Sequence, residues 1–280
     1  MPDLRNIDYS PSLEYQSNKD YDPYYFFIQA LAESNKFDLL LGYFSSSAIS
    51  TLALGFSKFI INGGKMRMII NNILTPADKE SIQNGLSNPP EYYNLSLYNY
   101  KDILNRLSER GVHFYECLAF LIAANKIEIK AIAPKNGQGI SHYKSGLFSD
   151  NKEEITFKGS CNFTAFALLE NLEELTIKQS WNTESDKNAI REYKDFFNQI
   201  FEENNQDVEY IDFSKVEAKI VEEFGRKDIN ELLRDETKLL EKIKQPQKYL
   251  SSKIYKKIKN YSEEILKIAS EPRFPPKMEV

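Results

Sequence analysis

Cysteine, histidine and long apolar runs are all scarce in this chain. Its 280 residues include only 2 cysteines and 2 histidines. Two cysteines cannot build a disulfide framework, and they do not have the paired spacing of a zinc site. No apolar run approaches the roughly 18–20 residues that span a bilayer, and the N-terminal residues MPDLRNIDYS lack the basic-then-apolar order of a signal peptide. These absences predict a cytoplasmic protein that does not contact membranes.

The composition is that of an ordinary globular protein. Hydrophobic residues make up 41% of the chain and charged residues 28%. The length allows one large domain, or one domain with a smaller appendage. A net charge of −5 argues against a surface that is basic all over, but a local basic groove would be enough to hold the phosphates of a nucleic acid.

The first half of the chain contains a strand–helix–strand pattern. After a polar, tyrosine-rich arm and a helix near residues 24–34, the continuous apolar run 37–44 predicts a buried strand. Ser45–Ser47 are suitable N-cap residues for a helix that Asn62–Gly64 would end, and the apolar run 66–70 predicts a second strand. Two strands joined by one helix indicate a parallel pair with a right-handed crossover.

Further elements follow this unit. Residues 75–125 look mostly helical, and an amphipathic helix is expected at 184–203, with Ile190, Tyr193, Phe197 and Ile200 on one side. The remaining predicted strands are 127–134, 141–150, 153–160 and 171–177. The pattern predicts an α/β fold with a mixed β-sheet flanked by helices.

The sequence becomes richer in charged residues after about residue 205. We expect one α/β domain over residues 1–205 and a charge-rich helical extension over 206–270. Residues 271–280 are proline-rich and read as a linker to a downstream domain. Seven lysines and no acidic residue lie between Lys242 and Lys259. Such a run is by default a solvated helix face, with DNA contact as the alternative.

One group of polar residues has the composition of a reactive site. His142 and Lys144 lie two apart, as do Ser160 and Asn162, and each pair would share a strand face. If the hairpin loop between their strands is the three residues Asp150–Lys152, His142 lies opposite Ser160. All four side chains would then share one face of the hairpin, whereas a loop of another length would shift the register.

These residue types suit attack on a phosphodiester. A histidine can act as nucleophile or general acid near neutral pH. Lys144 and Asn162 can bind the non-bridging oxygens as charge builds on phosphorus, so neither a metal nor a cofactor is required. Gly159 would let a phosphate approach the backbone, and Glu173 or its neighbour Glu174 could orient the imidazole.

The spacing of these residues resembles that of the phospholipase D superfamily, and most of all its nuclease branch. The matching residues are His142-x-Lys144, Gly159-Ser160-x-Asn162 and Asn171-x-Glu173. The segment GYFSSSAISTLALGF…GGKMRMII also looks like the first strand, helix and second strand of that fold. In all, the resemblance spans roughly residues 25–205.

The resemblance implies a role for each residue. In that family a histidine forms a covalent phosphohistidine and a second histidine protonates the leaving oxygen. His142 would be the nucleophile or the acid, with Lys144 and Asn162 as phosphate binders. Ser160 would be a positioning group, and Glu173 would be the partner of the histidine.

This chain departs from the family pattern at two points. The family places an aspartate five residues after the lysine, where this chain has Ser149, followed by Asp150. The family also needs two histidine–lysine motifs per site, and this chain has one. Its other histidine, His113, has no lysine two residues on and reads as structural. We therefore expect a homodimer that shares one active site on its two-fold axis.

Single-motif members include small nucleases, a metal-independent restriction endonuclease and modules at the N-terminus of superfamily 2 helicases. The run HYKSGLFSD…GSCNFTAFALLENLEEL looks most like the helicase modules, and no Walker motif is present in this chain. The resemblance implies DNA cleavage in prokaryotic restriction, with DNA, a second copy and a C-terminal helicase domain as partners. One alternative is a non-catalytic nucleic-acid-binding or dimerisation module of a helicase. A second alternative is a phospholipid hydrolase.

Overall fold

The computed structural model of the chain describes five continuous stretches and some single residues. The stretches are 1–41, 52–70, 122–135, 143–161 and 172–211, and the single residues lie between 221 and 267. The elements, in chain order, are the 3-10 helix η1 (Leu4–Asn6), β1 (Glu14–Gln16), α1 (Pro23–Ala32), β2 (Lys36–Leu41), α3 (Ala53–Ile61), β3 (Lys65–Ile70), β4 (Ile127–Pro134), β5 (Lys144–Ser149), β6 (Glu154–Gly159), β7 (Glu174–Gln179), α10 (Glu184–Phe201) and β8 (Val208–Ile211).

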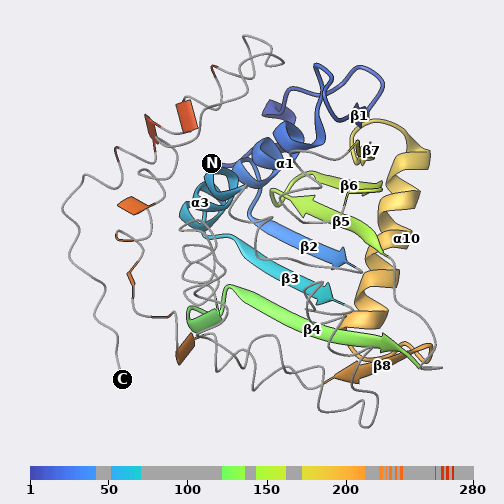
Figure 1. The fold of residues 1–280 in the computed structure, drawn as a ribbon. Helices are drawn as coiled ribbons and strands as arrows, with labels where there is room; N and C mark the ends of the chain where they lie inside the picture. Colours follow the sequence, from blue (N-terminus) through green and yellow to red (C-terminus); the bar gives the residue numbers. More distant parts are fainter. Residues whose placement is uncertain are drawn as a thin grey trace.

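The strands form one mixed sheet of eight, in the order β1-β7-β6-β5-β2-β3-β4-β8 (Figure 1). β2, β3 and β4 are parallel neighbours, and every other adjacent pair is antiparallel. The expected α/β class with a mixed sheet flanked by helices is confirmed. Both faces of the central strands are largely buried, which explains why their sequences read as continuous apolar runs.

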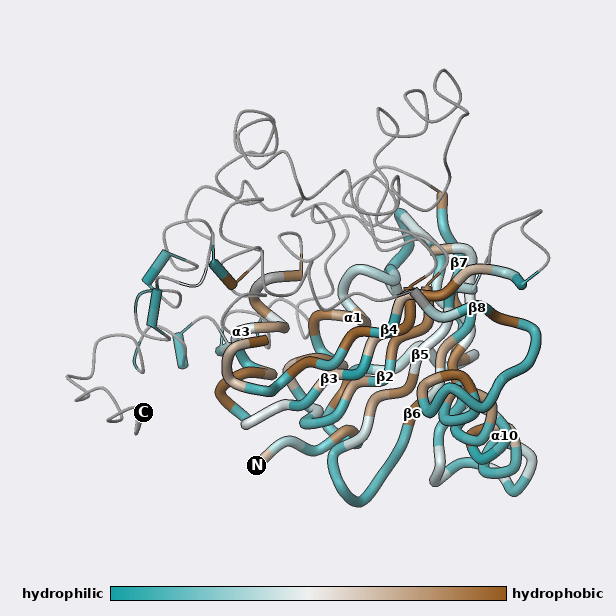
Figure 2. The backbone as a smooth tube through the Cα atoms, turned by 90° about the horizontal axis from the view of Figure 1, so that it is seen from below, coloured by the Kyte–Doolittle hydropathy of each residue, from teal (hydrophilic) through white to brown (hydrophobic). Residues whose placement is uncertain are grey.

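Helices cover the two faces of this sheet (Figure 2). α1 and α3 pack on one face, around a core that includes Phe27, Phe37 and Phe148. α10 packs on the other face and buries the predicted residues Ile190, Tyr193, Phe197 and Ile200 against Leu40, Ile69 and Leu147. Because adjacent residues of a strand point to opposite faces, Leu147 and Phe148 belong to different cores.

The predicted strand–helix–strand unit is confirmed. β2 and β3 are parallel and joined through α3, whose C-terminus has the expected glycine cap. Gly63 takes a left-handed φ of 72°, while the N–H groups of Gly63 and Gly64 bond the carbonyls of Ile60 and Phe59, each at 2.9 Å. This is a Schellman motif. The predicted N-cap cluster Ser45–Ser47 lies outside the described residues.

The β5–β6 hairpin forms, but its predicted register is wrong. Ser149 pairs with Glu154, so the loop contains four residues, Asp150–Glu153, instead of three. The Asp150 carboxylate accepts hydrogen bonds from the N–H groups of Lys152 and Glu153, both at 2.8 Å, and Asn151 takes a left-handed φ of 78°. The Asp150 side chain therefore stabilises a loop that is one residue longer than predicted. The alternation of apolar residues along the strands does not reveal this local effect.

The shifted register changes which residues share a face. Ser145 pairs with Lys158, and the same register places Lys144 opposite Gly159. Lys144 and Ser160 therefore do not lie on a common face of the hairpin, contrary to prediction. Ser160 instead lies just beyond β6, where its N–H donates to the carbonyl of Glu174 at 3.1 Å.

Two short edge strands were missed. Glu14–Gln16, in the arm expected to be irregular, forms β1 against β7. Val208–Ile211, placed by the sequence in the helical extension, forms β8 against β4. Both strands have three or four residues, too few to show a period. Most of the expected extension, the linker and residues 75–121 lie outside the described residues, and the domain division stays a prediction. In the described part of the chain no helix is long and apolar enough to cross a membrane.

Candidate active site

Three of the five predicted site residues are described, and all three lie at one edge of the sheet. Lys144 is the first residue of β5 and pairs with Leu41, the last residue of β2. Ser160 directly follows β6, and Glu173 directly precedes β7. The remaining two, His142 and Asn162, lie outside the described residues, as does His113. The sheet topology thus brings Lys144, Ser160 and Glu173 to the edge where β2 ends.

Glu173 is the most constrained of these side chains. It is 8% exposed, and its carboxylate accepts a hydrogen bond from the Ser160 hydroxyl. The same hydroxyl accepts a hydrogen bond from the N–H of Glu174 at 3.1 Å. A buried carboxylate needs such donors, because an unsatisfied buried charge costs several kcal/mol. The pair is therefore held in one geometry before any substrate binds.

The backbone of Glu173 is held from the N-terminal arm. Its N–H donates to the Ser17 hydroxyl at 3.0 Å, and the Ser17 N–H donates to the Glu173 carbonyl at 2.9 Å. These two bonds continue the β1–β7 pairing by one residue, since Gln16 already pairs with Glu174. Sequence reasoning missed Ser17, because nothing local distinguishes it from the other polar residues of the arm.

Lys144 lies in a partly desolvated position beside charged and polarisable groups. Burial lowers the pKa of its ammonium, while the nearby Glu173 and Cys161 act to raise it. A cation that has already lost part of its hydration binds a phosphate oxygen at a smaller further cost. Lys144 is therefore suited to the phosphate-binding role predicted for it.

Cys161 lies buried next to this cluster. Burial is the main cause that raises the pKa of its thiol from 9.0 to about 12, assisted by Glu173 and Asp22 and opposed by Lys144. A thiol with that pKa stays protonated near neutral pH and is a poor nucleophile. The prediction that Cys161 is a small residue facing the core is confirmed, since it is 2% exposed and belongs to the core under α1.

Gly159 has a packing role. A Cβ at this position would overlap the Glu174 carbonyl oxygen and would lie 3.1 Å from the Leu175 Cα. The glycine is therefore required by the close approach of the β7 backbone, whereas the sequence had suggested access for a phosphate. Either a close strand or a close phosphate would require a glycine here. The position of β7 shows that its backbone occupies the space beside Gly159.

Asp150 lies at the other end of β5, away from Lys144. It is 6% exposed, and besides capping its own turn it accepts a hydrogen bond from the N–H of Leu4 at 2.7 Å. Asp150 lies one residue after the position of the family's aspartate, and in this chain it forms the hairpin turn. This aspartate joins the N-terminal arm to the hairpin, at the opposite end of β5 from Lys144.

Comparisons with known proteins return fold likenesses only. No family model and no curated protein matches this chain. Among solved structures, NucT from Helicobacter pylori is 17% identical, over 68% of this chain and 94% of that one, with a TM-score of 0.38. A phospholipase D family member, Nuc from Salmonella typhimurium, is 14% identical over 66% and 93%, with a TM-score of 0.39. Phosphatidylserine synthase from Haemophilus influenzae is 15% identical over 70% and 43%, with a TM-score of 0.39. Identities and TM-scores this low establish neither family membership nor activity.

Proposed function

We propose that this chain supplies half of the active site of a metal-independent nuclease, which cleaves DNA through a phosphohistidine. The observation that carries the proposal is the edge cluster of Lys144, Ser160 and Glu173, in which a cation lies beside a pre-oriented hydroxyl–carboxylate pair. His142 precedes Lys144 by two residues, and Asn162 follows Ser160 by two.

The proposed reaction has two balanced steps. A ring nitrogen of His142 attacks phosphorus and forms a P–N bond, the P–O bond to the leaving nucleoside breaks, and a second histidine gives its proton to the leaving oxygen. Water then attacks the phosphohistidine, the P–N bond breaks, and the second histidine takes the proton from that water. Lys144 and Asn162 bind the non-bridging oxygens in both steps, which supplies the neutralisation that a metal would otherwise provide.

The second histidine comes from a second copy of the chain. The chain has one histidine–lysine pair, and a symmetric dimer would bring two copies of the edge cluster together on its axis. The two imidazoles then titrate as a coupled pair, one neutral and one protonated. The proposed setting, taken from the resemblance, is restriction of foreign DNA in a prokaryote, with the nuclease domain preceding a helicase.

The decisive experiment is plasmid cleavage in excess EDTA by the unmodified chain, by His142→Ala and by His113→Ala. The matched control is His113, because it is the only other histidine. We expect the unmodified chain and His113→Ala to cut, and His142→Ala to lose at least about 100-fold in rate. Acid-labile phosphate should be trapped on the unmodified chain and on His113→Ala, but not on His142→Ala.

Other outcomes would overturn the proposal in identifiable ways. DNA binding without cleavage would indicate a non-catalytic binding module of a helicase. Cleavage that EDTA abolishes would exclude the metal-independent mechanism. Hydrolysis of phosphatidyl lipids in vesicles, with plasmid untouched, would indicate a lipid hydrolase. A monomeric mass by light scattering for the cutting species would exclude the shared site.

A further inference from the structure

Three parallel strands of the sheet have a lysine at their first residue or directly before it, in the same register. Lys36 and Lys65 are paired neighbours at the first positions of β2 and β3. Lys126 immediately precedes β4, and Met66 pairs with Ile127, so Lys126 lies opposite Lys65. We call these three residues the lysine row. Since neighbouring strands lie about 4.8 Å apart, the row spans roughly 10 Å across the sheet.

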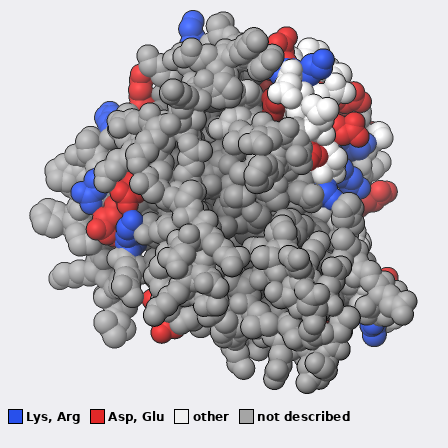
Figure 3. All heavy atoms as spheres, viewed as in Figure 1, with Lys and Arg blue, Asp and Glu red and all other residues white. Residues whose placement is uncertain are grey.

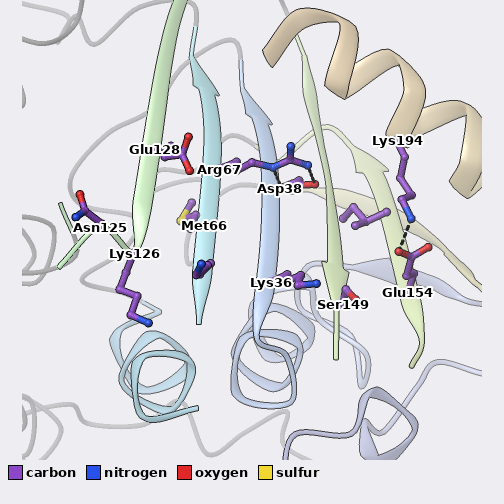
Figure 4. A pocket seen from close by; sticks show the side chains of 12 residues that line it. Lys36, Asp38, Met66, Arg67, Asn125, Lys126, Glu128, Ser149, Glu154 and Lys194 are labelled. Atoms are coloured by element: carbon purple, nitrogen blue, oxygen red, sulfur yellow. Dashed lines mark hydrogen bonds and ion pairs between the residues drawn. The ribbon is translucent and has the colours of Figure 1, made fainter. Parts of the chain in front are cut away.

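The lysine row lines an open pocket of about 370 Å³. Figure 4 shows Lys36 and Lys126 at the beginnings of β2 and β4. Lys36 and Lys65 are exposed and Lys126 is half-buried, and none of the three forms an ion pair with a described residue. The row therefore offers three cations that nothing in the described part of the chain neutralises.

Most carboxylates of the pocket already have partners. Asp38 accepts two hydrogen bonds from the Arg67 guanidinium, at 2.7 and 2.5 Å, and Glu154 pairs with Lys194 at 2.7 Å (Figure 4). Glu128 is the one remaining carboxylate among the lining residues. The pocket is thus locally positive on a chain whose net charge is −5. Elsewhere, on the described surface visible in Figure 3, basic and acidic side chains are interspersed.

The lysine row is separate from the candidate active site. Lys36 pairs with Ser149, and Lys144 pairs with Leu41 five residues further along the strands, so the two lie roughly 17 Å apart. They also belong to different faces. Lys36 alternates with Phe37 of the α1 core and shares its face with Leu40 of the α10 core. A ligand of the row is therefore not the phosphate under attack.

We propose that the lysine row binds backbone phosphates of nucleic acid, as a second contact remote from the cleavage site. Lysine ammoniums are point charges that accept a phosphate from many directions, and they suit a regularly charged backbone read without sequence preference. The open, solvated position favours a polyanion, which gains by counterion release at each contact, over a small anion. The identity of this ligand rests on the proposed function, in which nucleic acid is the substrate.

The observations favour nucleic acid over a lipid surface. Membrane-binding surfaces combine cations with apolar side chains that enter the bilayer. Among the described residues, the exposed large hydrophobics are Met1 and Leu172, and neither lines the pocket. A charged row whose pocket has no exposed large hydrophobic residue among the described residues matches a phosphate backbone in water.

The test measures how DNA affinity depends on salt. Lys36, Lys65 and Lys126 are changed together to Gln, in a His142→Ala background so that the DNA stays intact. Fluorescence anisotropy with a 30-base-pair duplex, in EDTA, gives the slope of log K against log salt. Each lost phosphate contact removes about 0.9 from that slope, so we expect a decrease of roughly 2–3. A triple Lys→Arg variant, which keeps the charges, should retain the slope.

The control variant changes Lys178, Lys187 and Arg191 to Gln, which removes the same charge from another surface. Lys178 and Lys187 already pair with carboxylates, so the slope should change by less than one contact. Equal slopes for the two Gln variants would overturn the proposal, provided thermal unfolding shows both folded. Loss of binding to phosphatidylserine vesicles by the row variant, with its DNA slope unchanged, would also overturn it.

Failure of this inference is distinguishable from failure of the nuclease function. Plasmid cleavage by the unmodified chain is measured separately. A reduced slope without any cleavage upholds the lysine row and removes the proposed activity. Cleavage by the unmodified chain, with equal slopes for both Gln variants, supports the nuclease activity and excludes the lysine row as a DNA contact.

Discussion

The Ser160 hydroxyl donates a hydrogen bond to the carboxylate of Glu173, and the two residues meet from strands that are adjacent in the sheet. They are 13 residues apart in the sequence. β6 ends before Ser160, and β7 begins after Glu173. The pair therefore lies at an edge of the sheet, fixed by the pairing of the strands that carry it.

Changing Ser160 to Ala should lower both the stability of the protein and its cleavage activity. The buried Glu173 loses a donor, so we expect a loss of about 1–3 kcal/mol in the free energy of unfolding, measured by urea denaturation. The matched control is Ser180→Ala. The Ser180 hydroxyl likewise donates to Glu153, at 2.5 Å, and accepts from the N–H of Glu154, at 3.0 Å. Both variants should lose stability, and only Ser160→Ala should also lose cleavage. Equal cleavage by the two would remove Ser160 from the site.

Stability should fall between pH 9 and pH 10 because of Cys161. Its thiol has a pKa of about 12 in the folded chain, raised from 9.0 mainly by burial. The unfolded chain therefore loses this proton first, and the stabilisation that is full below pH 9 is lost as pH rises towards 12. We expect this thiol to contribute about 1 kcal/mol less stability at pH 10 than at pH 9.

The measurement is urea unfolding at both pH values, with Cys161→Ala as the control. That variant should show a smaller decline, because the buried thiol is absent. The buried tyrosines, whose pKa values are also raised by burial from 10.0, add to the decline in this pH range and are common to both proteins. An identical decline in the two proteins would contradict the assignment to Cys161.

Asp150→Ala should destabilise the hairpin and detach the N-terminal arm. The carboxylate accepts hydrogen bonds from three backbone N–H groups, those of Leu4, Lys152 and Glu153. Removing it leaves buried donors unsatisfied, at an expected cost of about 2–4 kcal/mol. Asp150→Asn keeps one acceptor oxygen and should cost less. Unfolding midpoints measure both, and a loss of cleavage without a loss of stability would point instead to a catalytic aspartate.

Gly159→Ala should be destabilising because β7 leaves no room for a side chain. The added Cβ would overlap the Glu174 carbonyl oxygen, which is backbone and cannot rotate away. We expect a cost of about 1–3 kcal/mol in the free energy of unfolding. Gly63→Ala is a useful comparison, since nothing lies near that Cβ and the cost comes from its left-handed φ alone, about 1 kcal/mol. A tolerated Gly159→Ala that still loses cleavage would favour a phosphate next to the glycine.

Secondary structure was predictable wherever a long segment had one strong period. α10 was predicted to within two residues, because its apolar residues recur at helical spacing and Thr183 caps it. The parallel β2–β3 pair followed from two apolar runs joined by one helix. The edge strands β1 and β8 were not predictable, because three or four residues carry no period and their pairing partners lie far away in the chain.

The composition of the candidate site stays a prediction from the sequence, and its predicted hairpin register was wrong. The spacing of His142, Lys144, Ser160, Asn162 and Glu173 indicated phosphodiester chemistry before any fold was known. The first four were predicted to meet on one hairpin face, which depended on a register that differs by one residue at the Asp150 turn. Lys144, Ser160 and Glu173 still lie at one edge, because β7 adds to the sheet beside β6.

The sequence by itself determined the α/β class, the apolar strands and the residue types available for chemistry, because these depend on local periodicity and side-chain identity. Tertiary structure alone decided that Ser17 holds the Glu173 backbone, that Gly159 makes room for β7, and that Lys36, Lys65 and Lys126 form one row. Each of those relationships joins residues far apart in the chain. They arise from strand order and register, which are set by long-range packing.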